Sequence, residues 1–388
     1  NQGVTAPEGF RAAGIAAGIK ASGKPDLALV FNEGPDLSAA GVFTRNKVRA
    51  APVQWSRQVL KAGRLRAVIL NSGGANACTG QAGHDDAVAI LLALGSPAID
   101  LLGITTVGGN QTLEKVTYNA RRILALVDRE DVPVYPGSPR PLVHQVEVAP
   151  EIHGESGLDG VTLPEPRVAA REERAANFIV RTVMERPEKS VTLVATGPLT
   201  NIALAARLEP RIVERVKDVV LMGGGYHEGN WTAMAEFNIW VDPEAARIVF
   251  EEPWRVTMVG LDLTHQALVT PEFEEQIAAQ DTEVSRFFVD LMAFFRATHQ
   301  DFFGFDNPPL HDPCALAYVI DPDVMVTRRA PVRIETRGEF TMGMTVADFR
   351  APAPPDCHTQ VATRLNQRRF WQLLADSLRR LGERRLGE

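Results

Sequence analysis

Residues 218–242 read DVVLMGGGYHEGNWTAMAEFNIWVD, and this stretch decides the fold that we predict. Its first part, residues 219–222, is a short apolar run that stops at three consecutive glycines. A continuous apolar run that ends at a glycine loop is typical of a parallel strand buried on both faces. The stretch therefore predicts an α/β protein with a functional loop at the carboxyl end of a central strand.

The loop carries side chains suited to a small polar ligand. Asn230, Glu236 and Asn238 supply two amides and a carboxylate, and apolar residues such as Phe237 alternate with them. Polar groups set between apolar walls are typical of a small-molecule pocket. The alternative is that the glycines form a flexible surface loop, with Glu236 solvated and the aromatic residues in the core.

Composition limits the classes of function. With 388 residues, 45% of them hydrophobic, the chain can form one large α/β domain with a smaller unit, or two domains. A formal charge of -7 disfavours nucleic acid or an anionic membrane as the main partner. Three cysteines without C-x-x-C spacing exclude a disulfide framework and the usual zinc spacing, and we expect no targeting or membrane segment. These features predict a cytoplasmic protein that acts on a small molecule.

The motifs LMGGGYHEGN and AEFNI resemble those of the inosine-uridine preferring nucleoside hydrolases. The resemblance implies a mostly parallel, doubly wound, Rossmann-like α/β sheet. It also implies a homo-oligomeric enzyme, dimer or tetramer, that hydrolyses purine and pyrimidine ribonucleosides to free base and ribose in purine salvage. Asn230, Glu236, Phe237 and Asn238 would then bind the substrate.

A second motif begins at His84 with HDDAVAILLA. Asp85 and Asp86 precede an apolar helical run, where first-turn carboxylates are favoured by the helix dipole whatever else they do. Paired aspartates after a first strand are also how an α/β sheet builds a divalent-cation site. The block resembles the family's opening D-x-D-P-G-x-D-D-A, which makes Asp86 a metal ligand and Asp85 its support.

Two further polar residues extend the predicted pocket. Asn110 follows a predicted strand at residues 101–107, and ligands bind outside the carboxyl ends of such strands. The segment IHGESG at residues 152–157 resembles the family's HGETG-type sequence, which gives His153 the role of contacting the base. Without that resemblance, a lone loop histidine is more often a solvated or capping side chain.

Thr196 and the pair His311 and Asp312 complete the set. Thr196 follows a predicted strand at residues 190–195. The segment TGPLTN resembles the family's TG-x-LTN motif, which makes the Thr196 carbonyl a calcium ligand. An ordinary strand-to-helix turn is the alternative. Asp312 precedes a proline, as does Asp242, and both are good helix N-caps. The segment HDPCALAY resembles the family's HDPCAVAY, which makes Asp312 a metal ligand and His311 the proton donor to the leaving base. Asp242 receives no catalytic role.

These residues suggest a calcium-dependent reaction. Oxygen ligands from Asp86, Asp312 and the Thr196 carbonyl favour Ca²⁺ over zinc. A calcium ion could hold the ribose hydroxyls and a water that attacks C1′, while a histidine protonates the departing base near neutral pH.

The chain departs from the family at the first two aspartates of its opening motif. Ungapped, these positions are Thr79 and Gln81, and neither can replace a carboxylate. We prefer a gapped interpretation in which residues 67–70 form the first strand of the hydrolase and Asn71 stands at its end, because NSGGANAC is a poor strand. Both interpretations predict impaired hydrolysis, and a protein that binds nucleoside and calcium without turnover is the alternative.

Residues 1–83 differ in character from the rest. The segments PEGFRAAGIAAGIK, AGVFTRNKVRAAPV and NSGGANACTG resemble the amino-terminal part of the ornithine/glutamate N-acetyltransferase family. That family uses a threonine exposed by self-cleavage, and no matching sequence follows Gly83. We therefore predict an acetyltransferase-like fragment at residues 1–83 and a nucleoside hydrolase domain at residues 84–388. A fusion carrying an acetyltransferase-related module is the alternative.

Overall fold

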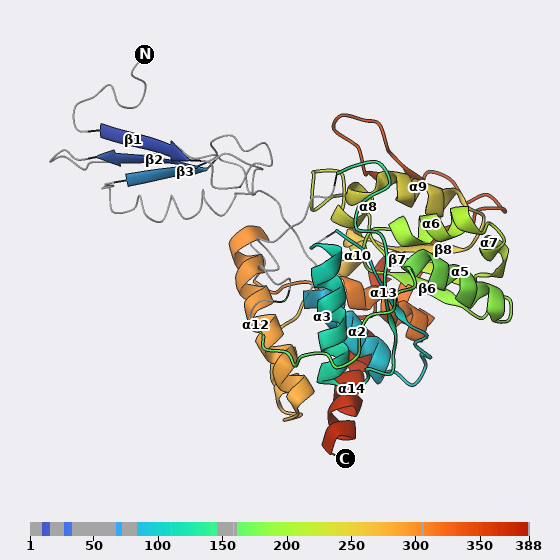
Figure 1. Cartoon of the computed structure of the whole chain (residues 1–388). Helices are drawn as coiled ribbons and strands as arrows, with labels where there is room; N and C mark the ends of the chain where they lie inside the picture. The colour runs from blue at the N-terminus through green and yellow to red at the C-terminus, as the bar shows by residue number, and fades with distance from the viewer. Residues whose placement is uncertain are drawn as a thin grey trace. The chain divides into compact units, whose positions relative to one another are not determined.

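The structure is a computed structural model that describes residues 10–15, 27–32, 67–71, 84–109, 111–145, 158, 161–303 and 306–386 (Figure 1). The chain divides into two compact units, Asn1–Cys78 and Thr79–Glu388.

The first unit contains a three-stranded antiparallel sheet. Its strands, in the order β1-β2-β3, are β1 (Phe10–Ile15), β2 (Leu27–Asn32) and β3 (Ala67–Asn71). The prediction that residues 67–70 form a strand is confirmed. The prediction that this strand belongs to the hydrolase sheet is wrong, because β3 pairs antiparallel with β2, with Leu29 opposite Ile69. A short apolar run identified a strand but could not identify its partner.

The second unit is built on a mostly parallel sheet in the order β6-β7-β8-β12-β9. The first four strands run parallel and β9 is antiparallel to β12. Two smaller sheets accompany it, the parallel pair β4-β5 and the antiparallel pair β10-β11. The strands are β4 (Ile104–Thr106), β5 (Val134–Pro136), β6 (Thr192–Ala195), β7 (Asp218–Met222), β8 (Val256–Val259), β9 (Met325–Arg329), β10 (Val332–Ile334), β11 (Thr345–Ala347) and β12 (Thr359–Leu365).

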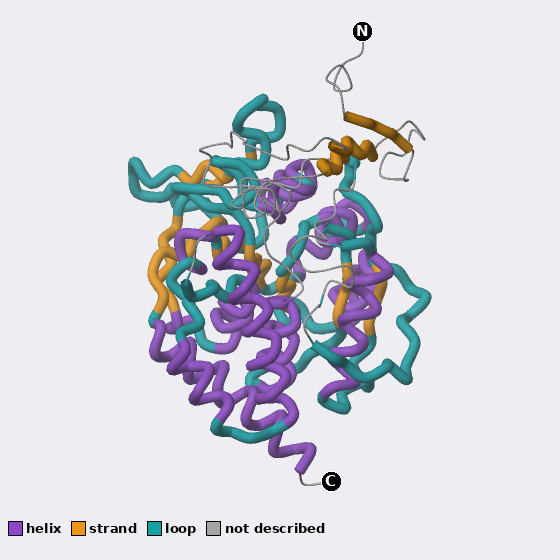
Figure 2. The backbone as a smooth tube through the Cα atoms, turned by 90° about the vertical axis from the view of Figure 1, so that its left-hand side faces the viewer, coloured by secondary structure: helices purple, strands orange, loops and turns teal. Residues whose placement is uncertain are grey.

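Helices alternate with these strands along the chain. They are α2 (His84–Gly95), α3 (Leu113–Leu126), α5 (Ala175–Glu185), α6 (Thr200–Leu208), α7 (Ile212–Arg215), α8 (Phe237–Val241), α9 (Pro243–Glu251), α10 (Leu261–Thr264), α11 (Pro271–Ala278), α12 (Glu283–Phe303), α13 (Asp312–Ile320) and α14 (Gln367–Leu386). Figure 2 shows these helices and strands by type from a second direction. Within the described ranges, no helix combines the length and apolar content needed to cross a bilayer.

The central strand β7 explains why helices cover both faces of the sheet. All five of its residues are buried. Val220 and Met222 pack into one core with residues of α2, α13 and α14, whereas Val219 and Leu221 pack into a second core with residues of α5, α6 and α9. Alternate side chains of a strand point to opposite faces, so two helical layers bury this one apolar run. The predicted doubly wound α/β fold is confirmed.

The pair β4-β5 is tied to α6 by one side chain. Asn201 donates from Nδ2 to the Thr106 carbonyl at 2.9 Å and accepts from the Ser138 backbone N–H at 2.9 Å. Asn201 is buried, and a Cβ on Gly137 would lie 2.1 Å from its side-chain oxygen. A larger residue at position 137 would therefore displace the Asn201 amide from these two hydrogen bonds.

Asp242 joins three segments on the second-core side of the sheet. Its carboxylate accepts from the Ala245 N–H at 3.1 Å, which caps α9 as predicted. It also accepts from the Thr200 hydroxyl at 2.6 Å and from the Leu142 N–H at 3.0 Å, and it is fully buried. Asp242 therefore holds α6, α9 and the loop at Leu142 together.

We expect Asp242→Ala to lower the free energy of unfolding by roughly 2 to 4 kcal/mol, because it removes a helix cap and leaves buried donors without an acceptor. Asp242→Asn should cost less, since its oxygen can still cap α9. Urea unfolding monitored by circular dichroism measures both losses. Equal stability of the alanine variant and the unchanged protein would contradict this structural role.

Candidate active site

Three acidic residues meet where the amino-terminal ends of α2 and α13 face the carboxyl end of β6. The Thr196 hydroxyl donates to Asp86 Oδ1 at 2.6 Å. Asp86 also shares a hydrogen bond with Asp312, and burial, followed by the charges of Asp85 and Asp86, holds the pKa of Asp312 well above its usual range. The predicted convergence of Asp86, Thr196 and Asp312 is therefore present in the structure.

Asp85 links the two helices. Its carboxylate accepts hydrogen bonds from the backbone N–H groups of His311 and Asp312 at the start of α13. Burial, and then the neighbouring charge of Asp86, raise the pKa of Asp85 to about 7. Asp85 thus holds the start of α13 against α2, instead of serving only the first turn of its own helix.

Asp312 does not act as the helix cap that its position before a proline suggests. His311 is the N-cap residue of α13, and no side-chain hydrogen bond caps this helix. Asp312 is 2% exposed, and its Oδ2 atom has no hydrogen-bond partner among the residues that the structure describes. A buried carboxylate oxygen without a partner is an available ligand atom.

Glu236 shapes the glycine loop after β7. Its carboxylate accepts from the N–H groups of Gly224 at 2.9 Å, Asn238 at 2.9 Å and Ile239 at 3.2 Å. Burial raises the pKa of Glu236 to about 7, although these three donors favour the charged form. Glu236 therefore caps α8 and fixes the loop at the same time.

The glycine loop itself is buried, so the alternative of a flexible surface loop is wrong. Gly224 has a φ of +76°, and a Cβ there would lie 2.8 Å from the Thr345 hydroxyl. That hydroxyl accepts from the Gly225 N–H at 2.9 Å and donates to the Gly225 carbonyl at 2.7 Å. Only glycine fits the backbone conformation and the space at position 224.

Asn238, Asn230 and Phe237 are placed by backbone contacts. Asn238 donates from Nδ2 to the carbonyls of Thr196 at 3.0 Å and Met222 at 3.2 Å, and its buried Oδ1 lacks a partner within the described part of the chain. Asn230 Oδ1 accepts from the Phe237 N–H at 2.9 Å. Phe237 is 1% exposed and meets Trp231 edge to face at 5.0 Å. Asn238 therefore joins the ends of β6 and β7.

His311 lies beside Asp312 and is 1% exposed. Its Nδ1 atom is 2.6 Å from the Thr264 hydroxyl, and its ring meets that of His265 edge to face at 5.5 Å. These contacts with Thr264 and His265 fix the orientation of the His311 ring.

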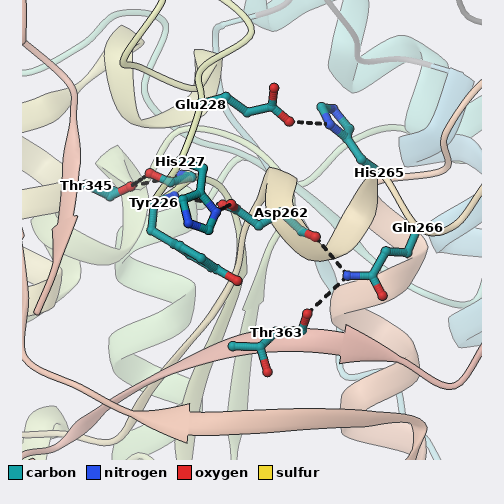
Figure 3. A network of polar contacts seen from close by, with 9 residues as sticks. Tyr226, His227, Glu228, Asp262, His265, Gln266, Thr345 and Thr363 are labelled. Carbon is teal, nitrogen blue, oxygen red and sulfur yellow. Dashed lines mark hydrogen bonds and ion pairs between the residues drawn. The ribbon is translucent and has the colours of Figure 1, made fainter. Parts of the chain in front are cut away.

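A polar network that the sequence analysis missed surrounds Asp262 in α10 (Figure 3). Asp262 accepts from the Tyr226 N–H at 2.7 Å and lies 2.7 Å from His227 Nδ1. His265 Nδ1 lies 2.9 Å from Glu228. This network anchors the loop after the glycines. A carboxylate that closely follows β8 was the available signal, since strand ends of such sheets carry functional groups.

Four predicted positions are not placed. Asn110, His153, Thr79 and Gln81 lie outside the described residues.

The fit of a divalent cation is partial. Asp86, Asp312 and the Thr196 carbonyl supply oxygen donors, as does Asn238 Oδ1, which has no partner among the described residues. Over the described ranges, however, no group of three or more His, Cys, Asp or Glu residues is arranged to hold a metal ion. Two carboxylates are fewer than the anionic ligands of most calcium sites.

Comparison with protein families identifies the larger part of the chain. Residues 81–372 match the model described as "Inosine-uridine preferring nucleoside hydrolase". The chain belongs to this family. Residues 11–101 match the ArgJ family, which confirms the acetyltransferase-like resemblance of the first segment.

Individual relatives agree with the family assignment. The chain is 56% identical over 302 residues to an inosine-uridine preferring nucleoside hydrolase of Crithidia fasciculata, covering 78% of this chain and 96% of that protein. It is 43% identical over 297 residues to a pyrimidine-specific ribonucleoside hydrolase, RihA, of Citrobacter koseri, covering 76% and 95%. The solved structure of a purine-preferring ribonucleoside hydrolase from Gardnerella vaginalis superposes with a TM-score of 0.73 at 34% identity, covering 78% and 96%.

The raised pKa of Glu236 predicts a pH dependence of stability. As pH rises from about 4.5 to about 7, the unfolded chain releases a proton that folded Glu236 keeps, so the free energy of unfolding falls. A pKa shift of that size corresponds to about 3 kcal/mol. Urea unfolding at pH 5 and pH 7.5, in the presence of a chelator, measures this fall.

Glu236→Gln should remove this part of the slope, whatever its effect on absolute stability. The exposed Glu275→Gln variant is the matched control and should keep the full slope. An identical slope in the Glu236→Gln and unchanged proteins would contradict the raised pKa.

Proposed function

We propose that this chain hydrolyses the N-glycosidic bond of purine and pyrimidine ribonucleosides to free base and ribose. The observation that carries the proposal is the meeting of Asp86, Thr196 and Asp312, with His311 adjacent, at the carboxyl end of a parallel sheet. Membership of the nucleoside hydrolase family supports the reaction class. Release of free ribose from inosine and from uridine is the direct test.

The loop after β7 would bind the ribose. Asn230, Glu236, Phe237 and Asn238 would line the sugar site, and their backbone contacts hold them in place before substrate arrives. Preorganised polar groups of this kind lower the cost of stabilising charge that develops on the sugar. Asn110 and His153 would contact the substrate as the family resemblance implies.

Calcium is the cation that these oxygen donors suit best, and Asp86, Asp312 and the Thr196 carbonyl would hold it. When bound, such an ion activates the attacking water. Asp85 would support the site by holding the start of α13 through its contacts with His311 and Asp312. Two of these ligands, Asp86 and Asp312, are anionic, which is fewer than calcium sites usually have. We therefore propose that the chain binds the metal weakly and hydrolyses nucleosides slowly.

His311 would protonate the leaving base. Thr264 and His265 orient its ring, and a histidine exchanges protons readily near neutral pH.

We expect His311→Ala to slow hydrolysis of inosine by roughly 10²- to 10⁴-fold with a much smaller change in KM, because a proton donor acts mainly as the bond breaks. Steady-state kinetics measures both parameters. The control is His144→Ala. His144 Nε2 lies 3.1 Å from Glu244 Oε2, and this pair is outside the candidate active site. A raised KM with unchanged turnover would make His311 a binding residue.

Restoring the family's opening motif tests the weak metal site. We expect replacement of residues 79–82 by D-x-D-P to increase both calcium affinity and the rate of nucleoside hydrolysis, because it adds anionic ligands and a base for the water. Isothermal titration with calcium and a ribose-release assay measure the two effects. Equal calcium affinity and equal hydrolysis rates in the two proteins would show that another carboxylate already supplies the missing ligand and base. Asp85 is the nearest candidate.

The small number of carboxylates favours one alternative, a protein that binds nucleoside and calcium without turnover. Nucleobase release measured with and without added calcium separates this protein from an enzyme. A fusion with an acetyltransferase-related module is tested by acetyl transfer from acetylornithine to glutamate. We further propose a cytoplasmic homo-oligomer, for which sedimentation measures the oligomeric state.

A further inference from the structure

A cavity of about 580 Å³ lies between β4 and β6 in the second unit. Its walls include every residue of both strands, together with residues of α2, α3, α5 and α6. Asp86 and Thr196 stand at one end, but Glu236, Asn238, His311 and Asp312 do not line it. The cavity therefore borders the candidate active site without belonging to its sugar-binding loop.

Both strands present an unpaired edge to this cavity. Strand β4 pairs with β5, and β6 pairs with β7, but no described strand lies between β4 and β6. In a parallel pair, the N–H and C=O groups of alternate residues point to opposite sides. A strand edge exposes backbone donors and acceptors that another strand can satisfy.

The hydrogen bonds show which residues face the cavity. The Ile104 N–H donates to Pro133 at 2.9 Å, and the Thr106 carbonyl accepts from Gly137 at 2.9 Å, so the backbone of Thr105 faces away from β5. On the other side, the Val191 carbonyl accepts from Lys217 at 2.8 Å. By the same alternation, the backbone groups of Thr192 and Val194 face the cavity.

The burial of the strands agrees with a missing neighbour. Every residue of β7 and β8 is buried, whereas all four residues of β6 are only partly buried. Strands of a parallel sheet that is covered by helices are normally buried on both faces. Strand β6 is therefore at an open edge in the middle of the fold.

The order of elements points to a strand in the same place. Helix α3 leads from β4 to β5, and α6 and α7 lead from β6 to β7, but no described strand of the second unit precedes α2. A strand that leads through α2 to β4 would lie beside β4, on the side that β5 does not occupy. That side is the cavity.

The residues directly before α2 do not read as such a strand. Residues 72–83, which precede α2, read SGGANACTGQAG and contain no β-branched apolar run. The nearest apolar run upstream, β3, already pairs with β2. A segment of another polypeptide is therefore the occupant that these strand edges fit.

We propose that this cavity, which we call the strand slot, binds an extended apolar peptide of another polypeptide as an added parallel strand between β4 and β6. Peptides commonly bind to exposed sheet edges in this way. Among the described residues, charged side chains line the slot at its ends alone, with Asp86 at the carboxyl end and Asp100, Arg186 and Lys217 at the other. The occupant is an uncharged stretch of four or five residues rich in Val and Ile, and its carboxyl end reaches Asp86 and Thr196. This binding does not rest on the proposed hydrolysis.

The test uses the full chain and a fluorescein-labelled peptide with the core Val-Ile-Val-Val-Ile and a lysine at each end. We expect saturable binding by fluorescence anisotropy and slower amide hydrogen exchange at Thr105, Thr192 and Val194. The control peptide has proline at the second and fourth core positions, which removes two N–H donors. It should neither bind nor slow exchange.

A pair of variants tests the edge of β4. Thr105→Pro removes an N–H that faces the slot, while the β4-β5 contacts of Ile104 and Thr106 do not use it. We expect roughly tenfold weaker binding of the Val-Ile peptide to this variant. Thr105→Val keeps the N–H and should bind as the unchanged chain does. Circular dichroism confirms that both variants fold.

Three results would overturn the proposal. The first is equal binding of the proline-containing peptide, which would make the slot a general apolar cavity. The second is binding without slower exchange at the three named amides. The third is failure of the folded chain to bind the Val-Ile peptide. Since the peptide comparison uses the unchanged chain, it decides the question even if Thr105→Pro does not fold, and no readout depends on nucleoside hydrolysis.

Discussion

The meeting of buried carboxylates with two helix amino-terminal ends is the interaction on which this site depends. Asp85 and Asp86 lie in the first turn of α2, Asp312 begins α13, and Asp85 accepts from backbone N–H groups at the start of α13. Helix dipoles stabilise negative charge at these positions, but burial and mutual repulsion oppose it. The raised pKa values of Asp85 and Asp312 express this conflict. A cation would resolve it, and so would the uptake of protons.

Local sequence patterns predicted the elements of the second unit well. The apolar run of β7 was recognised because burial on two faces leaves a clear pattern. Some strands are shorter than predicted. Strand β4 spans Ile104–Thr106 within the predicted range 101–107, because hydrogen-bond pairing with a neighbouring strand, and not composition, sets where a strand ends. The motifs at Asp86, Thr196 and Asp312 were found at strand ends and helix starts, and these residues do converge.

The sequence could not reveal which distant segments contact each other. The run at Ala67–Asn71 is a good strand in any sheet, and only its pairing with β2 shows which sheet it joins. The place of Asp262 just after β8 was a signal, but its role depends on the Tyr226 backbone and the His227 side chain, which reach it from another loop. Contacts between distant segments leave no local pattern. The same limit applies to Asp85, whose backbone partners lie at the start of α13.

The attachment of β4-β5 through Asn201 has a consequence for how the second unit comes apart. A continuous sheet transmits strain through a row of backbone hydrogen bonds, so its strands open together. Here the bond between α6 and the β4-β5 pair passes through one amide side chain, at Thr106 and Ser138. Proteins open locally in cooperative units whose borders follow weak connections of this kind. The contact between α6 and the β4-β5 pair is therefore more easily broken than a strand ladder, while Ile123, Leu124 and Val134 stay buried in the core that they share with α2.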